Sequence, residues 1–148
     1  MTPPADRFFA LSPAQRRVVH ELLVEHALAK WNAYAERQGE IRYRESVTGT
    51  EQTVDASLPA HALASVRSGQ DVAALAERYS EPITAMQDQD LSFPEPIAFA
   101  YYAIYNFFRR YARHQEIDDW LLVNQACSSE VDEGKGQAML ENAIERAT

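Results

Sequence analysis

The clearest pattern in the chain is a helical repeat of apolar positions that begins near residue 13. Ser12 is a good N-cap, Pro13 suits the first helical position, and Gln15 completes a capping box. Apolar side chains then recur on one face with a 3.6-residue period. This pattern predicts a helix over residues 13–37 that ends at Gly39. Its apolar face comprises His20, Leu23, Val24, Ala27, Leu28, Trp31, Tyr34 and Ala35.

A second strong pattern covers residues 94–113, for which Ser92 is the expected N-cap. Seven of the 13 residues from Phe99 to Tyr111 are aromatic, and they span a broad apolar arc. An arc this wide is typical of a central helix that several neighbours contact.

The remaining patterns are shorter. Scattered apolar residues around Thr48-Gly49-Thr50 favour a small β-hairpin within residues 40–55. Helices are expected from about Pro59 to Gly69, from an Asp71 N-cap to Tyr79, from Ser80-Glu81-Pro82 to about Gln87, over 117–129 and over 137–146, with a loop at 130–136. In the helix over 117–129, the side chains expected to point inward are those of Ile117, Trp120, Leu121, Val123 and Cys127. The chain is therefore predicted to be a single all-α domain over residues 1–148, a bundle of about six helices with a short hairpin.

Composition agrees with this prediction. Of 148 residues, 46% are hydrophobic and 24% charged, which is ordinary for a globular domain and excludes general disorder. No stretch approaches the roughly 18 apolar residues of a membrane span. The one cysteine, Cys127, excludes a disulfide framework, and the first residues do not resemble a signal peptide, so we expect a cytoplasmic protein.

The net charge and its distribution along the sequence bear on the kind of partner that the protein binds. The net charge is −8, and it divides into −1 over residues 1–80 and −7 over residues 81–148. An acidic surface repels nucleic acid and anionic membranes and attracts basic partners. The simpler interpretation is that the charge keeps a small domain in solution.

Motifs for catalysis and metal binding are incomplete. His20 begins a sequence like that of a zinc protease helix, but Val24 stands where the second histidine is needed, so we expect a hydrogen-bonded core histidine. A calcium loop opening at Asp88 would need Gly and Glu where Phe93 and Phe99 stand. Phosphate-binding glycine loops and nucleophile elbows do not occur. We therefore expect no enzyme activity, no metal and no cofactor.

Two sets of side chains remain as candidates for binding. One is a stripe on the aromatic helix that carries Tyr and Arg, residue types enriched at interface hot spots: Phe99, Tyr102, Asn106, Arg109 and Arg113. The other is an acidic set: Asp88, Asp90, Asp118, Asp119, Glu130, Asp132 and Glu133. Packing and salt bridges would explain the first set, and ordinary solvation the second. The predicted partner-binding residues are Asp88, Asp90, Tyr102, Asn106, Arg109, Asp118, Asp119, Asp132 and Glu133.

Two segments suggest a family. Residues 78–91, RYSEPITAMQDQDL, and residues 99–106, FAYYAIYN, resemble the central part of the all-helical immunity proteins of bacterial polymorphic toxins. The resemblance covers about a third of the chain, and it assigns no role to any single residue. It implies a small, cytoplasmic, acidic domain that binds and blocks a cognate toxin, commonly a nuclease.

The leading hypothesis is therefore a non-enzymatic inhibitor that binds a basic protein through an acidic face. Two alternatives remain open. One is a small helical enzyme or ligand-binding protein with a polar pocket near Glu81, Asp88, Tyr102 and Asn106. The other is a homo-oligomeric scaffold, such as a homodimer, with the aromatic helix as its seam.

Overall fold

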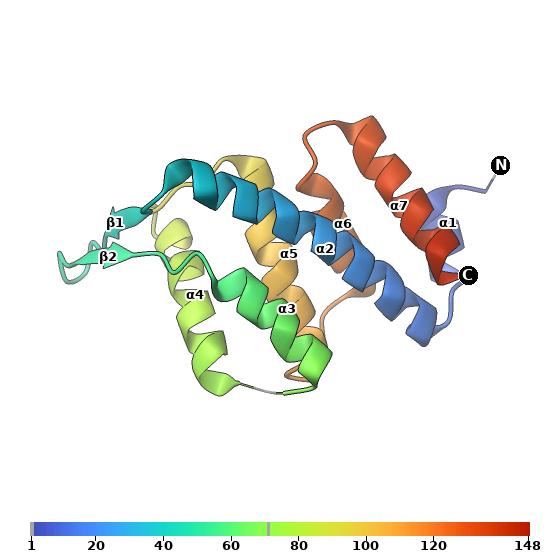
Figure 1. Ribbon diagram of the computed structural model, residues 1–148, viewed down its shortest axis with the longest axis horizontal. Helices are drawn as coiled ribbons and strands as arrows, with labels where there is room; N and C mark the ends of the chain where they lie inside the picture. The colour runs from blue at the N-terminus through green and yellow to red at the C-terminus, as the bar shows by residue number, and fades with distance from the viewer. Residues whose placement is uncertain (1, 71) are drawn as a thin grey trace.

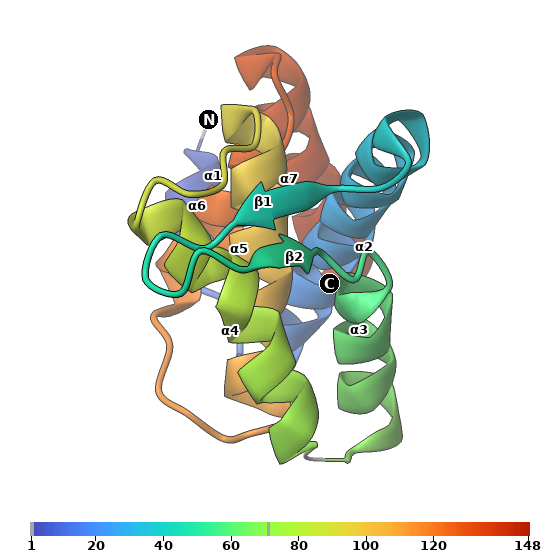
Figure 2. The same cartoon turned by 90° about the vertical axis from the view of Figure 1, so that its left-hand side faces the viewer.

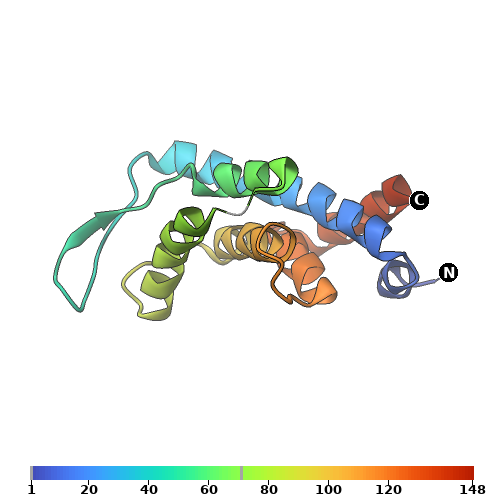
Figure 3. The same ribbon diagram turned by 90° about the horizontal axis from the view of Figure 1, so that it is seen from below.

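The computed structural model describes residues 2–70 and 72–148, and over these it confirms a mainly helical fold with one short hairpin. The elements are α1 (Pro4–Phe9), α2 (Pro13–Gln38), β1 (Arg42–Arg44), β2 (Glu51–Thr53), α3 (Leu58–Ser68), α4 (Ala73–Gln87), α5 (Glu95–Tyr111), α6 (Asp119–Ser128) and α7 (Glu133–Ala147). Helices α2 and α3 form one layer, and α4, α5 and α6 form the second (Figures 1 and 3). The hairpin lies at one end of the molecule, and α1 and α7 lie at the other with both chain termini.

Helix α2 follows its sequence pattern closely. Ser12 accepts a hydrogen bond from the Gln15 backbone N–H, and the Gln15 side chain accepts one from the Ser12 N–H, so the expected capping box is present. The helix ends where Gly39 takes a φ of 67°, a left-handed value that glycine adopts at little cost. The backbone of α2 runs the length of the bundle (Figure 1).

Helix α5 lies at the centre, in contact with α2, α3, α4 and α6. Several of its aromatic residues belong to the core: the Tyr101 ring centroid lies 4.9 Å from that of Trp31, which in turn meets Phe93 edge to face at 5.3 Å. The Trp31 indole donates to the Ala56 carbonyl at 2.9 Å. Tyr79 and Tyr101 donate reciprocally to each other's backbone carbonyls, at 2.7 and 2.9 Å. The wide apolar arc predicted for this helix is confirmed.

The buried apolar residues form two clusters. The hairpin-end cluster joins the C-terminal half of α2 to α3, α4 and α5, and Trp31 and Tyr101 belong to it. The α7-end cluster joins α1 to the start of α2, α6 and α7, and Phe8 and Leu140 belong to it. None of the helices over residues 2–70 and 72–148 has the length and apolar character needed to cross a membrane.

The predicted hairpin is present and antiparallel, with Tyr43 opposite Gln52. Strands of three residues are marginal on their own. The residue directly after β2 anchors the ribbon, because Val54 is buried and its N–H donates to the Ile41 carbonyl at 2.8 Å. Figure 2 looks directly onto this end of the molecule, where the hairpin crosses in front of the bundle.

His20 is the expected core histidine, only 1% exposed. Its Nε2 lies 2.9 Å from the Asp119 carbonyl oxygen, which can only accept, so Nε2 carries the hydrogen. Its Nδ1 lies 2.8 Å from the Tyr111 hydroxyl, which then donates. Burial, with help from the Arg110 and Arg16 charges, lowers the pKa of His20 to about 3.

Two predicted boundaries in the middle of the chain are wrong. Helix α4 runs without a break through Pro82, where we expected one helix to end at Tyr79 and another to begin. Pro82 removes one backbone hydrogen bond, but Tyr79, Pro82 and Ala85 are all buried on one side, and this packing holds the two halves in line. The expected Asp71 N-cap lies outside the described residues. Helix α5 begins after Pro94, so Ser92 is not its cap.

Three features near the two ends of the chain also differ from the sequence prediction. Helix α1, which the pattern did not predict, is only six residues long and depends on the complete burial of Phe8. In α6 the inward residue is Leu122, whereas Leu121 is 42% exposed. Helix α7 begins at Glu133 rather than 137, because the Asp132 side chain accepts from two backbone N–H groups of its first turn.

A glycine of α7 has a packing role. Gly136 lies against α6, where a Cβ would sit 3.2 Å from the carbonyl oxygen of Cys127. The lack of a side chain lets α7 approach α6 closely, so a residue that indicated a loop in the sequence instead serves a helix contact.

Candidate functional site

An acidic depression lies between the hairpin and α4, and we call it the acidic cleft. Its volume is about 340 Å³. Four of its side chains, Glu77, Glu81, Thr84 and Asp88, follow one another at spacings of three or four residues and so lie on one face of α4 and the turn after it. The lining consists of Tyr43, Glu45, Gln52, Glu77, Ser80, Glu81, Thr84, Ala85, Asp88 and Asp90.

The hairpin is held over α4 by Asp90. The Asp90 carboxylate accepts from both the backbone N–H and the hydroxyl of Ser46, at 3.0 and 3.1 Å. The turn that presents Asp90 is closed by a hydrogen bond from its N–H to the Ala85 carbonyl at 2.8 Å, and Gln89 takes a φ of 64° within it. These bonds place Glu45, from the hairpin, opposite the acidic face of α4.

The cleft has a strongly one-sided charge. Five of the residues that line it are Asp or Glu, and none of the described residues that line it is Lys or Arg. Burial raises the pKa of the Tyr43 phenol, and the nearby charges of Glu81, Glu45 and Asp90 raise it further. Tyr43 therefore keeps its proton at neutral pH and can donate a hydrogen bond at the edge of a negative site.

These carboxylates do not form a metal site. Within residues 2–70 and 72–148, no group of three or more His, Cys, Asp or Glu side chains is arranged to hold an ion. The five carboxylates are spread over the hairpin, α4 and the following turn.

One hydroxyl group of the cleft is already engaged within the fold. Ser80 is one of the hydroxyl-bearing residues of its lining, with Thr84 and Tyr43, and its Oγ donates to the Glu77 carbonyl at 2.7 Å. That hydrogen bond commits the hydroxyl to the helix backbone, whereas an activated nucleophile must donate to a general base.

Two of the predicted acidic residues act within the fold at the start of α6. Asp118 caps the helix by accepting from the Leu121 N–H at 2.9 Å. Asp119 pairs with Arg16 at 3.1 Å and also with Arg110. Both carboxylates are therefore bound by neighbouring groups of the chain, and the depression that they line also contains Arg16 and Arg110.

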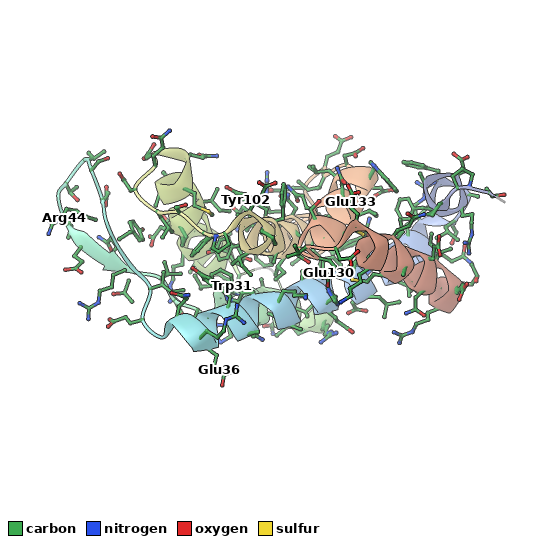
Figure 4. The ribbon with its side chains drawn as sticks, turned by 90° about the horizontal axis from the view of Figure 1, so that it is seen from above. Trp31, Glu36, Arg44, Tyr102, Glu130 and Glu133 are labelled. Atoms are coloured by element: carbon green, nitrogen blue, oxygen red, sulfur yellow. The ribbon has the colours of Figure 1, made fainter. Side chains whose placement is uncertain are left out.

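The acidic residues around the α6–α7 turn are likewise divided. Asp132 caps α7 by accepting from the Gly134 N–H at 2.8 Å. Glu130 pairs with Lys30 at 3.0 Å, and this contact is the main reason why its pKa is lowered. Glu133 is exposed (Figure 4). The structure thus does not gather the seven predicted acids on one face: Asp88 and Asp90 lie in the cleft, and the others lie at the opposite end.

The stripe on α5 is partly covered by α6. Asn106 is only 9% exposed and donates to the Gln125 side chain at 2.8 Å. Arg109 bonds Gln115 at 2.7 Å and lies over the Tyr105 ring. Tyr102 is half-buried and contacts the Met86 sulfur.

The four residues named for the alternative pocket in the sequence analysis are divided. Glu81 and Asp88 line the acidic cleft, but Tyr102 and Asn106 do not. The aromatic seam proposed for a homodimer is mostly interior, because Tyr101, Phe107 and Phe108 are all buried within one chain.

Tyr43, Glu45 and Glu77 are among the cleft residues that the sequence analysis did not single out for binding. The polar repeat of Glu77, Glu81 and Asp88 along one helix was a usable signal. The contributions of Tyr43 and Glu45 depend on where the hairpin folds back, which no local pattern reveals.

Comparison with protein-family models found no match, and comparisons with curated proteins and with solved structures found none either.

Proposed function

We propose that this protein is a non-enzymatic binding protein whose acidic cleft receives a basic segment of a protein partner, in the manner of an immunity protein that neutralises a cognate toxin. The observation that carries the proposal is the cleft itself, with five carboxylates and no Lys or Arg among its described lining residues. A concentration of like charge costs folding energy through self-repulsion, and an approaching cation relieves it.

A guanidinium or ammonium group suits this cleft. Arg and Lys side chains donate several hydrogen bonds, and carboxylates are their strongest acceptors. The cleft carboxylates come from a helix, a turn and a hairpin, so a partner loop with two or three basic side chains could engage them together. The resemblance of residues 78–91 to immunity proteins supports the same region, because this segment supplies Glu81, Asp88 and Asp90.

The experiment measures the affinity of a fluorescein-labelled oligo-arginine peptide by fluorescence anisotropy. The test variant is Glu77→Gln/Glu81→Gln/Asp88→Asn, which neutralises three exposed cleft carboxylates and leaves the Asp90–Ser46 bonds in place. The matched control is Glu36→Gln/Glu116→Gln/Glu145→Gln, which changes net charge equally at exposed sites outside the cleft. Glu36 points away from the bundle (Figure 4).

We expect the cleft variant to bind about tenfold more weakly, since each exposed charge pair contributes up to ~1 kcal/mol. The control should stay within about twofold, as remote charges are screened beyond a Debye length of about 8 Å. Equal losses in the two variants would show that the peptide senses only net charge, and the cleft would have no special role.

To test whether the protein neutralises a toxin, its natural partner must first be identified. The product of the adjacent gene is the first candidate, tested by co-purification with the tagged wild-type chain and with both triple variants. Capture that is lost in the cleft variant and kept in the control supports the immunity function. Capture that both variants retain would place the interface elsewhere.

A further inference from the structure

A second concave site lies at the opposite end of the molecule, where α5, α6 and α7 meet the start of α1. This site, which we call the α6–α7 groove, has a volume of about 710 Å³. That volume falls within the roughly 300–1,000 Å³ typical of sites for small organic molecules.

The groove is lined mainly by apolar side chains. Val123 and Leu140, at 1% and 6% exposure, form its most deeply buried part. Phe99 from α5 and Trp120 from α6 are half-buried and supply aromatic surface. Because this apolar surface is recessed, it suits a compact molecule that can enter between the helices.

Apart from Ser128, the polar side chains that line the groove are amides and carboxylates. Asn124 and Gln137 are exposed amides that can donate or accept. Glu95 and Glu133 are exposed carboxylates in the first turns of α5 and α7, and the described lining includes no Lys or Arg. The third carboxylate, Glu130, is already paired with Lys30 and with His26.

We propose that the α6–α7 groove binds a small organic cation, a molecule with an apolar body and one positively charged group. The apolar body would lie against Phe99, Trp120 and Leu140, and the charged group would lie near Glu95 and Glu133. Aromatic rings also favour a cation over their faces. This site is separate from the acidic cleft and does not depend on the function proposed there.

The test uses three probes that share one apolar body: 4-phenylbutylamine, 4-phenylbutanol and 4-phenylbutyrate. Binding to the full chain is followed by ¹⁵N–¹H NMR, with the Trp120 indole as the reporter inside the groove. Trp31, the other tryptophan, is fully buried in the hairpin-end cluster and serves as an internal reference. Ligands this small bind with Kd on the order of 1 mM.

We expect the amine to shift the Trp120 resonance saturably and to bind about tenfold more tightly than the carboxylate, with the alcohol between them. The Glu95→Gln/Glu133→Gln variant should bring the three affinities within about twofold of one another. Absence of a saturable shift with the amine, or a carboxylate that binds as tightly as the amine, overturns the proposal.

A second variant locates the site. Asn124→Arg/Gln137→Arg places bulk and positive charge at two exposed groove positions and should weaken amine binding at least tenfold. The matched control is Asn32→Arg/Asn142→Arg, at exposed positions outside the groove, which should leave binding within about twofold. Equal binding by the two arginine variants would also overturn the proposal, because the amine would then bind elsewhere.

Discussion

At the hairpin end of the molecule, Glu77 and Glu81 project from one face of α4 into an open cleft whose described lining has no basic residue. At the α7 end, Asp118 and Asp132 cap helices, and Asp119 joins two arginines. Both ends are rich in acidic residues. At the hairpin end five of them line one cleft, whereas at the α7 end most cap helices or pair with basic side chains, and Glu95 and Glu133 remain exposed at a mainly apolar groove.

The difference teaches that a count of charges along a sequence does not locate an acidic face. Residues 81–148 carry −7 and residues 1–80 carry −1, yet Glu45 and Glu77 of the cleft belong to the nearly neutral half. Side chains that cap a helix or pair with arginine stabilise the fold, whereas side chains without such a role are free to bind a partner.

The largest expected effect is a loss of stability, and it should differ between tryptophans of the two apolar clusters. Trp31→Ala should lower the free energy of unfolding by roughly 3–5 kcal/mol, because it removes a fully buried ring and its hydrogen bond to Ala56. Trp120→Ala, which truncates a half-buried ring, should cost about 1–2 kcal/mol. Urea denaturation of both variants checks this, and equal losses would contradict the assignment of Trp31 to the centre of the core.

The next effect is a pH dependence of stability, which we assign to His20 near the α7 end. His20 has a pKa of about 3 in the fold and about 6.5 when unfolded, so the unfolded chain binds a proton that the folded chain refuses. Stability should therefore fall as pH drops from about 6.5 towards 3, by about 3 kcal/mol at pH 4.5.

Denaturation midpoints across this pH range test the role of His20. His20→Gln should flatten the pH dependence, while His61→Gln, at an exposed position, should leave it unchanged. If His20→Gln keeps the wild-type slope, the acid sensitivity arises from other groups.

A smaller effect separates the two kinds of acidic side chain. Asp132→Ala removes a helix cap and should cost about 1 kcal/mol. Asp88→Ala, in the cleft, should change stability by less than about 0.5 kcal/mol, as is usual for exposed sites. Thermal unfolding of the pair measures this, and a larger loss for Asp88→Ala would mean that the cleft carboxylates support the fold.

The parts of the fold that were predictable have local causes. Ser12 and Gln15 cap α2 through groups three residues apart, and Gly39 ends it through its own backbone freedom. Of the parts that were missed, the continuation of α4 through Pro82 depends on packing, and the early start of α7 depends on the Asp132 side chain, which accepts from the first turn of that helix.

The residues of the candidate site were likewise predictable only where they depend on a local sequence pattern. Asp88 and Asp90 were predicted as binding residues, and the polar spacing along α4 connects Asp88 to Glu81 and Glu77. Glu45 could not be added, since its position depends on the contact between the hairpin and Asp90. The predicted acids of residues 118–133 could not be separated by role, because capping and pairing depend on the geometry of each helix end.

The most direct test of the comparison between the two ends is an NMR titration of the wild-type chain with the oligo-arginine peptide at two salt concentrations. We predict saturable shifts centred on Tyr43, Glu81 and Asp88, with binding that weakens at the higher salt concentration because exposed charges are screened. Shifts centred instead on Asp118 and Asp132, or spread evenly over all acidic residues, would contradict the account.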